Sequence, residues 1–209
     1  MAKYHKYVFD IKKRIFLGKF EKMYKNETRE GYDSWHQEDG RFLQRRFALS
    51  ILQDYNFNFI IDVGCGKGIF THLLKKKNNE IVGVDLSNAA LKVAKARYPD
   101  IDFIRLNINN IPVFKNFLSA SGKKRKIDLV IFMEVLSYVN NWKEILRQIS
   151  KHAEYVLITL FIPEDPIGFI KSEKELALEV ERYFEIIEDL YLRRKRCYVF
   201  FGRRKNVHI

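Results

Sequence analysis

The chain has 209 residues, of which 47% are hydrophobic and 14% aromatic, and its formal net charge is +12. This length and apolar content suit one domain with a sizeable core. No apolar run is long enough to cross a membrane, the first residues lack the apolar stretch of a signal peptide, and the two cysteines lie too far apart in sequence for a disulfide framework or a metal cluster. We therefore expect a cytoplasmic protein without a metal site.

Residues 1–35 differ in character from residues 36–209, and we expect them to form a helical cap or lid over that main domain. Apolar side chains recur there at helical spacing: Tyr4, Tyr7, Ile11 and Ile15. With lysines and arginines on the other faces, this pattern predicts an amphipathic basic helix. Such a helix could also lie on a membrane surface or bind a partner. We favour a lid across the substrate side.

The next segment combines a turn with aromatic and titratable side chains. Asp33 and Ser34 favour a turn or a helix cap, and Trp35 and His36 follow directly. Bulky aromatic side chains at such a position are suited to stacking on a substrate or gating its entry. We therefore expect Tyr32, Trp35 and His36 to contact the substrate.

A helix is expected after this turn, and it carries an arginine pair. Phe42, Leu49 and Leu52 mark its buried stripe, which brings Arg45 or Arg46 near the inner face. A buried arginine needs an anion. The carboxylate of a bound cofactor is one candidate, which we assign to Arg46, and a salt bridge within the fold is the other.

A glycine-rich turn follows, between an apolar strand predicted over residues 57–63 and a helix predicted over residues 69–76. Glycines let the backbone turn sharply and let a ligand approach more closely than a β-carbon would allow. The first turn of the helix adds unpaired N–H groups. The turn residues expected to contact a nucleotide-like ligand are Gly64, Cys65, Gly66 and Gly68.

The spacing of the turn indicates which nucleotide it suits. A dinucleotide fingerprint needs a third glycine where this chain has Ile69. Asp62, at the end of the strand, would repel a pyrophosphate but attract an ammonium group. The next strand, residues 80–84, leads to Asp85, which is suited to accept two ribose hydroxyls. A ligand with an amino group, a ribose and no phosphate fits, and S-adenosylmethionine is such a ligand.

The sequence D-V-G-C-G-K-G at residues 62–68, followed by G-V-D-L-S at residues 83–87, resembles the first two motifs of the class I S-adenosylmethionine-dependent methyltransferases. The similarity continues through residues 103–108 and 127–139 and covers roughly residues 57–205. It implies a three-layer α/β, Rossmann-like fold. The sheet would have seven strands and be mostly parallel, with the last strand antiparallel.

The remaining elements are read from periodicity. Residues 109–126 are expected to form a short helix and an exposed loop, and residues 173–181 a helix. Residues 184–191 and 197–201, separated by a basic turn, predict a terminal antiparallel hairpin.

Polar residues follow successive strands and are expected to share one edge of the sheet, where open α/β sheets bind ligands. Asn107 follows the strand at residues 101–106, where the family usually carries an acid for the adenine amino group. An amide oxygen can still accept that hydrogen bond. Glu134 follows the strand at residues 127–132 and is either a catalytic group or a residue that orders the glycine turn. The cofactor contacts expected along this edge are Asp62, Asp85, Leu86, Asn107, Ile108 and Met133.

Methyl transfer requires chiefly the alignment of acceptor and methyl group. A general base helps only when the acceptor arrives protonated. His36 is our leading candidate for this base, and Glu134 and Tyr138 are weaker candidates. A surface or packing role for His36 is the competing interpretation.

Residues 33–47 loosely resemble the entry to the nodulation N-methyltransferases and their bacterial relatives, with Ser34 in place of a proline. This resemblance implies methylation of N or O on a small, anionic or carbohydrate-related acceptor. Two alternatives remain open. The first is methylation of RNA or protein through the basic surface, and the second is a non-catalytic domain that binds the cofactor. The basic runs behind the first alternative are residues 75–77, 123–126, 193–196 and 203–205.

Overall fold

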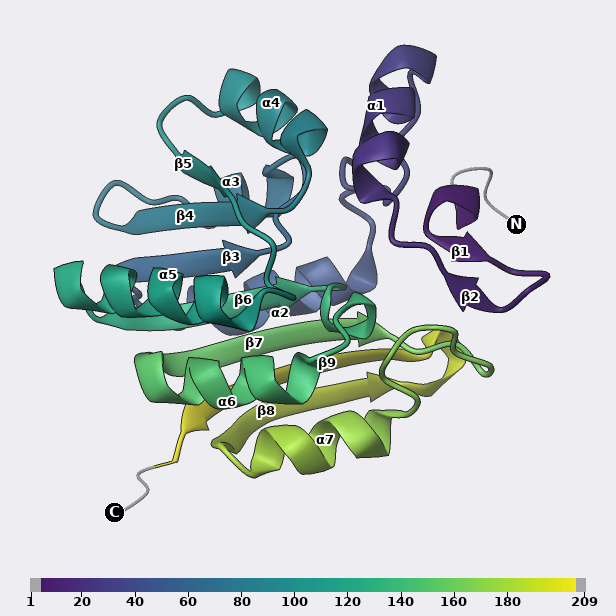
Figure 1. The fold of residues 1–209 in the computed structure, drawn as a ribbon. Helices are drawn as coiled ribbons and strands as arrows, with labels where there is room; N and C mark the ends of the chain where they lie inside the picture. Colours follow the sequence, from purple (N-terminus) through teal and green to yellow (C-terminus); the bar gives the residue numbers. More distant parts are fainter. Residues whose placement is uncertain (1–4, 206–209) are drawn as a thin grey trace.

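A sheet of seven strands forms the centre of the molecule (Figure 1). The computed structural model describes residues 5–205. The strands of this sheet are β3 (Phe59–Val63), β4 (Glu80–Asp85), β5 (Asp102–Arg105), β6 (Ile127–Met133), β7 (Ala153–Phe161), β8 (Phe184–Leu192) and β9 (Cys197–Arg204). Their order is β5-β4-β3-β6-β7-β9-β8, with β3 to β7 parallel and β9 antiparallel to both of its neighbours. The predicted mostly parallel sheet and its terminal hairpin are confirmed.

Helices cover both faces of the sheet and make the three layers. On one face lie α5 (Ile111–Lys124), α6 (Trp142–His152) and α7 (Glu173–Glu181), and on the other lie α2 (Leu43–Gln53), α3 (Ile69–Leu73) and α4 (Asn88–Arg97). Because both faces are covered, the central strands are apolar almost throughout. All five residues of β3 are buried, and Asp62 is the polar one among them.

Helix α5 is longer than the short helix expected within residues 109–126. The side chain of Asn110 accepts a hydrogen bond from the backbone N–H of Val113 at 3.3 Å, and Pro112 lies in the first turn. Both features favour helix initiation. The buried side chains of Phe114 and Leu118, four residues apart, then hold the helix on the sheet.

The prediction of an amphipathic helix near the N-terminus is wrong for the described residues. A 3₁₀ turn, η1 (His5–Tyr7), leads into a small hairpin of β1 (Phe9–Asp10) and β2 (Ile15–Phe16). The carboxylate of Asp10 accepts the backbone N–H of Lys13 at 3.0 Å, and Arg14 adopts a positive φ of 53°. An aspartate that bonds the backbone a few residues on favours a turn over a helix. Tyr4 lies outside the described residues.

The helix of the N-terminal segment is α1 (Phe20–Glu30), which lies beside α4 (Figure 1). It ends at Gly31, which has a positive φ of 69° and donates its N–H to the carbonyl of Glu27, a common helix ending. The carboxylate of Glu21 accepts hydrogen bonds from the Ser87 hydroxyl at 2.7 Å and from the backbone N–H of Ala89 at 3.1 Å. These bonds join α1 to the first turn of α4. We call residues 5–35 the cap segment.

Basic residues gather at both ends of the strands. Residues 75–77 and 123–126 precede β4 and β6, and residues 203–205 close the antiparallel β9, so these three runs lie at the amino ends of the parallel strands. Residues 193–196 lie at the opposite edge, between β8 and β9. Among residues 5–205, no helix has the length and apolarity needed to cross a membrane.

Candidate functional site

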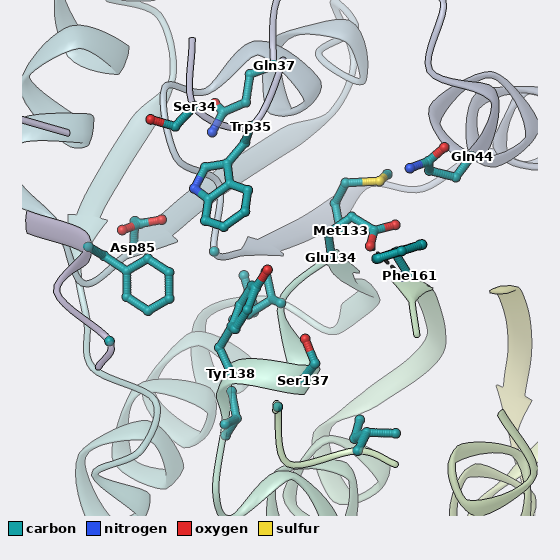
Figure 2. Close-up of a pocket in the computed structure, with 18 of the residues that line it drawn as sticks. Ser34, Trp35, Gln37, Gln44, Asp85, Met133, Glu134, Ser137, Tyr138 and Phe161 are labelled. Carbon is teal, nitrogen blue, oxygen red and sulfur yellow. Dashed lines mark hydrogen bonds between the residues drawn. The ribbon is translucent and has the colours of Figure 1, made fainter. Parts of the chain in front are cut away.

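A cavity of about 1080 Å³ lies between the carboxyl ends of the parallel strands and the cap segment. Asp62, Asp85, Asn107 and Glu134 all line it. They come from β3, β4, the residues after β5 and the residue after β6, so the sheet gathers polar groups that are far apart in sequence. Figure 2 shows Asp85 and Glu134 on two sides of this space, with Trp35 between them.

Asp85 holds the glycine turn in place. Its Oδ2 accepts the backbone N–H of Gly66 at 3.0 Å, and its Oδ1 accepts the backbone N–H of Ser87 at 2.8 Å. Burial raises the pKa of Asp85, and these backbone hydrogen bonds oppose that rise. Two carboxylate oxygens offer about four acceptor positions. Asp85 can therefore accept two further hydrogen bonds from a ligand in the cavity.

Asp62 is the most deeply buried acid of the site, with a side chain that is 1% exposed. Its Oδ2 accepts the Thr71 hydroxyl at 2.6 Å, whereas its Oδ1 has no hydrogen-bond partner among the described residues. Burial raises the pKa of Asp62 to about 7. An unpartnered buried oxygen on the cavity wall suits a hydrogen-bond donor on a ligand, and a cationic donor best, because it would also stabilise the ionised form.

The glycines of the turn are required by the packing of the protein itself, and their contacts with a ligand stay a prediction. All three have a positive φ: 74° at Gly64, 56° at Gly66 and 76° at Gly68. A β-carbon on Gly64 would lie 2.3 Å from the Val135 side chain, and one on Gly68 would lie 2.6 Å from the ring of Phe103. Of these glycines, Gly64 alone lines the cavity, beside Cys65.

Gly66 lies beneath the cap segment. A β-carbon there would come within 2.8 Å of the Tyr24 hydroxyl in the cap segment and within 2.3 Å of the amide of Gln37, just after that segment. The Oε1 of Gln37 accepts the backbone N–H of Lys67 at 2.9 Å, and its Nε2 donates to the Tyr24 hydroxyl at 2.9 Å. Gly66 and Gly68 therefore shape the site from behind its wall.

Lys67, between Gly66 and Gly68, joins the glycine turn to the cap segment through two ion pairs. Its ammonium lies 2.9 Å from a carboxylate oxygen of Glu27 and 2.9 Å from one of Asp33. The side chains of Lys67 and Glu27 are only 9% and 4% exposed. Burial lowers the pKa of Lys67, but the two carboxylates outweigh it and raise the pKa overall. Sequence reasoning did not find this ion triad, because its members are up to 40 residues apart.

Glu134 accepts hydrogen bonds from three residues of the protein. Its Oε2 accepts the backbone N–H of Phe161 at 2.6 Å, and its Oε1 accepts the Thr159 hydroxyl at 3.0 Å. Burial raises its pKa, while these bonds and one from Gln44 oppose the rise. Its backbone has a φ of 60°, which is unusual for a residue with a side chain. These contacts join the ends of β6 and β7 to α2 and favour a positioning role.

Aromatic side chains from the cap segment meet Tyr138 beside the cavity. The Tyr138 ring lies 5.7 Å from that of Trp35, 5.4 Å from that of Phe20 and, in a stacked arrangement, 6.0 Å from that of Phe16. Figure 2 shows Trp35 and Tyr138 directed toward one another. Burial, and then the charge of Glu134, raise the pKa of Tyr138. Tyr138 therefore stays protonated at neutral pH.

His36 lines the cavity from an exposed position in the turn before α2. Its ring stacks on that of Phe42, with centroids 5.7 Å apart, and its backbone has a φ of 48°. This strained conformation is supported by Arg45, whose guanidinium donates to the carbonyls of His36 and Gln37 at 2.8 Å each. Strain of this kind is often found at functional positions.

The structure does not bring every expected residue to the cavity. Of the expected pair, Arg46 is exposed and Arg45 lines the wall, but the Arg45 guanidinium binds backbone carbonyls rather than a buried acid. Helix α2 begins after Phe42, so its apolar face turns Arg46 outward. Tyr32 also lies outside the described wall. The remaining expected wall residues that do line it are Leu86, Asn107, Ile108 and Met133.

Asn107 is partly occupied by its own loop. Its Oδ1 accepts the backbone N–H of Asn109 at 3.1 Å, and its side chain is exposed at the cavity wall. Ile108, next to it, is buried and offers an apolar surface. An adenine-like ring could therefore lie against Ile108, with the Asn107 side chain at its edge.

A family model described as a methyltransferase domain matches residues 61–154. Among curated proteins, a putative methyltransferase of Invertebrate iridescent virus 6 is 28% identical over 54% of this chain and 39% of its own length. The ubiquinone biosynthesis O-methyltransferase of Nitrosomonas europaea is 28% identical over 52% of this chain and 45% of its own length. The chain thus spans about half the length of the curated relatives that it matches.

Solved structures share the fold. The N-methyltransferase NodS from Bradyrhizobium japonicum, in complex with S-adenosyl-L-homocysteine, matches with a TM-score of 0.65 at 15% identity, over 87% of this chain and 97% of its own. An S-adenosylmethionine-dependent methyltransferase from Clostridium acetobutylicum matches with a TM-score of 0.66 at 13% identity, over 86% and 98%.

Proposed function

We propose that this chain is a class I S-adenosylmethionine-dependent methyltransferase, in keeping with the methyltransferase domain model that matches residues 61–154, and that it transfers a methyl group to N or O of a small, anionic acceptor. The observation that carries this proposal is the unpartnered, buried oxygen of Asp62, which lines the same cavity as Asp85. Together they suit the amino group and the ribose of the cofactor. The acceptor would enter from the side of Trp35 and Tyr138.

The residues of the site fit S-adenosylmethionine. The α-ammonium would bind Asp62, the ribose hydroxyls would bind Asp85, and the adenine would lie against Ile108 beside Asn107. The cofactor supplies an activated methyl group on a sulfonium. The protein supplies alignment and excludes water, and the cap segment is suited to act as a lid.

The titration of Asp62 predicts how cofactor binding depends on pH. The pKa of Asp62 in the folded protein is about 7, above the usual value of 3.8. The folded protein therefore keeps this proton up to near-neutral pH. Because the unfolded chain ionises at lower pH, the free energy of unfolding falls as the pH rises from about 3.8 to about 7. An ammonium ligand favours the ionised form. Affinity for S-adenosylhomocysteine should therefore increase by up to about tenfold from about pH 5.5 to about pH 7.

Calorimetric titration at several pH values tests this dependence. Asp62→Asn cannot ionise and should bind more weakly, with a nearly flat pH profile in the same range. A wild-type affinity that is constant over the range, in a protein that remains folded, would contradict the assignment of the ammonium to Asp62.

A general base, where the acceptor needs one, is best supplied by His36. Glu134 accepts hydrogen bonds on both oxygens, and Tyr138 stays protonated because its pKa is raised. His36 is exposed and lines the cavity wall on the side of Trp35.

His36→Ala should lower turnover by about 100-fold or more if His36 removes a proton from the acceptor. The affinity for S-adenosylhomocysteine should be unchanged, because the histidine acts on the acceptor side. Steady-state turnover and calorimetry on the same preparation separate the two quantities. Turnover equal to that of the wild type would show that His36 is not the base and only packs against Phe42.

Methylation of RNA is the weaker alternative. Three of the four basic runs lie at the amino ends of the parallel strands, opposite the cavity, so a nucleic acid bound there would not reach the methyl group. Methyl-labelled cofactor incubated with small carboxylates, phosphates and phosphorylated sugars, and in parallel with RNA, tests the choice. Label in a small product supports the proposal, and label in RNA alone contradicts it.

A further inference from the structure

The cavity has two unlike ends. The acids of the cofactor end follow β3 and β4. The other end, which we call the apolar end, lies between the β1–β2 hairpin and the loop that follows β7. Its wall is made by aromatic and aliphatic side chains, of which the principal ones are Phe9, Ile11, Phe16, Phe161, Ile167 and Ile170. An acceptor bound there would contact carbon atoms over most of its surface.

The apolar end is a built feature of the fold. The guanidinium of Arg14 in the hairpin pairs with the carboxylate of Asp165 in the loop, with one hydrogen bond at 2.6 Å. The backbone N–H of Phe169 donates to the carbonyl of Ser137 at 2.8 Å, and a β-carbon on Gly168 would lie 2.7 Å from that carbonyl. The hairpin and the loop are thereby joined to one another and to the segment that carries Tyr138.

The lysines and arginines that line the cavity differ in whether the protein neutralises their charge. Arg14 is paired with Asp165, Arg41 lies 2.9 Å from Asp39, and Arg45 binds backbone carbonyls. Lys195 also lines the cavity, from the 3₁₀ turn η3 (Arg193–Lys195) between β8 and β9. Among the lysines and arginines of the described cavity wall, Lys195 is the one whose ammonium or guanidinium has neither an acidic partner within 4.0 Å nor a hydrogen bond to the protein.

From these two features we propose that the acceptor is an amphiphile, with an apolar acyl or aromatic body in the apolar end and an anionic group, carboxylate or phosphate, at Lys195. This inference rests on the proposed methyltransferase function and specifies its substrate class. A carbohydrate is a poorer fit, because its hydroxyls would face the Phe and Ile side chains without hydrogen-bond partners. A fully charged small anion would also leave the apolar wall uncovered.

Calorimetric titration with four probes tests this inference: decanol, decanoate, decyl phosphate and a sugar phosphate. Each is added to the protein saturated with S-adenosylhomocysteine. We expect decanoate and decyl phosphate to bind about three- to fivefold more tightly than decanol, as for an exposed ion pair, and the sugar phosphate to bind most weakly. The advantage of the anions should shrink at about 1 M salt, where such pairs are screened. The two anions distinguish a carboxylate from a phosphate headgroup.

Two variants and a control identify the residues responsible. Lys195→Gln should remove the preference for anions and leave the affinity for decanol unchanged, whereas Phe161→Ala should weaken decanol and decanoate by the same factor. Arg194→Gln is the matched control, because Arg194 is an exposed neighbour outside the cavity wall, and it should keep the preference.

Equal affinity of the wild type for decanol and decanoate, or tighter binding of the sugar phosphate, would overturn the inference. If S-adenosylhomocysteine itself does not bind, the proposed function fails. If it binds and none of the amphiphiles does, only the acceptor class is wrong.

Discussion

Replacing Lys67 by methionine should lower the free energy of unfolding by about 3–5 kcal/mol, as expected when one partner of a buried ion pair is removed. The ammonium lies 2.9 Å from carboxylate oxygens of both Glu27 and Asp33. Methionine fills a similar volume but leaves both carboxylates unpaired in a largely buried position. Burial already raises the pKa of Glu27, and Lys67 opposes that rise, so Glu27 should take up a proton in the variant.

Denaturant unfolding followed by circular dichroism measures the change. Lys92→Met is the matched control, because Lys92 is exposed on α4, and it should unfold within about 0.5 kcal/mol of the wild type. Adding Glu27→Gln to Lys67→Met should recover part of the loss, since it removes one of the two unpaired charges. A Lys67→Met protein as stable as the Lys92→Met control would show that the triad does not hold the cap segment on the glycine turn.

Asp85→Ala should weaken the binding of S-adenosylhomocysteine by about 1.5–3 kcal/mol, or about tenfold to 150-fold, because charge-assisted hydrogen bonds to the ribose are lost. The substitution also frees the backbone N–H of Gly66, which Asp85 holds at 3.0 Å. Some of the loss will therefore come from the glycine turn itself.

Asp85→Asn separates the two contributions. An asparagine Oδ1 can still accept the N–H of either Gly66 or Ser87, but it brings no charge to the ribose. Its affinity should fall between those of the wild type and Asp85→Ala. Asp102→Ala, an exposed acid at the far end of the neighbouring strand β5, should bind as the wild type does. Wild-type affinity in a folded Asp85→Ala protein would remove Asp85 from the cofactor site.

The domain from β3 onward could be predicted because its determinants are local. The apolar run before Gly64 makes β3, and the polar residues at the ends of the parallel strands must meet at one edge. Helix α7 begins after Ser172, whose hydroxyl accepts the N–H of Glu175 at 3.1 Å, and its bounds were predicted correctly as residues 173–181. Such capping and periodicity need no knowledge of distant residues.

The cap segment could not be predicted in the same way. Its apolar residues at Tyr7, Ile11 and Ile15 fit a helical period, but the turn at residues 11–14, where Asp10 accepts the N–H of Lys13, makes a hairpin instead. The end of helix α1 is indicated in the sequence by Gly31, because a glycine suits the left-handed conformation that ends many helices.

No pattern in the sequence around the cap segment predicts which distant residues it contacts. The pairing of Glu27 with Lys67 joins residues 40 positions apart. The insertion of Gln37 over Gly66 likewise depends on how α1 docks. Both follow from tertiary packing, which periodicity does not encode.

Calorimetric titration of the whole chain with S-adenosylmethionine and S-adenosylhomocysteine, beside a dinucleotide control, tests the central claim most directly. We expect binding of both sulfur nucleosides at micromolar concentrations and no binding of the dinucleotide, because Asp62 would repel its pyrophosphate. Binding of the dinucleotide, or of neither sulfur nucleoside, would contradict the assignment of Asp62 and Asp85 to this cofactor.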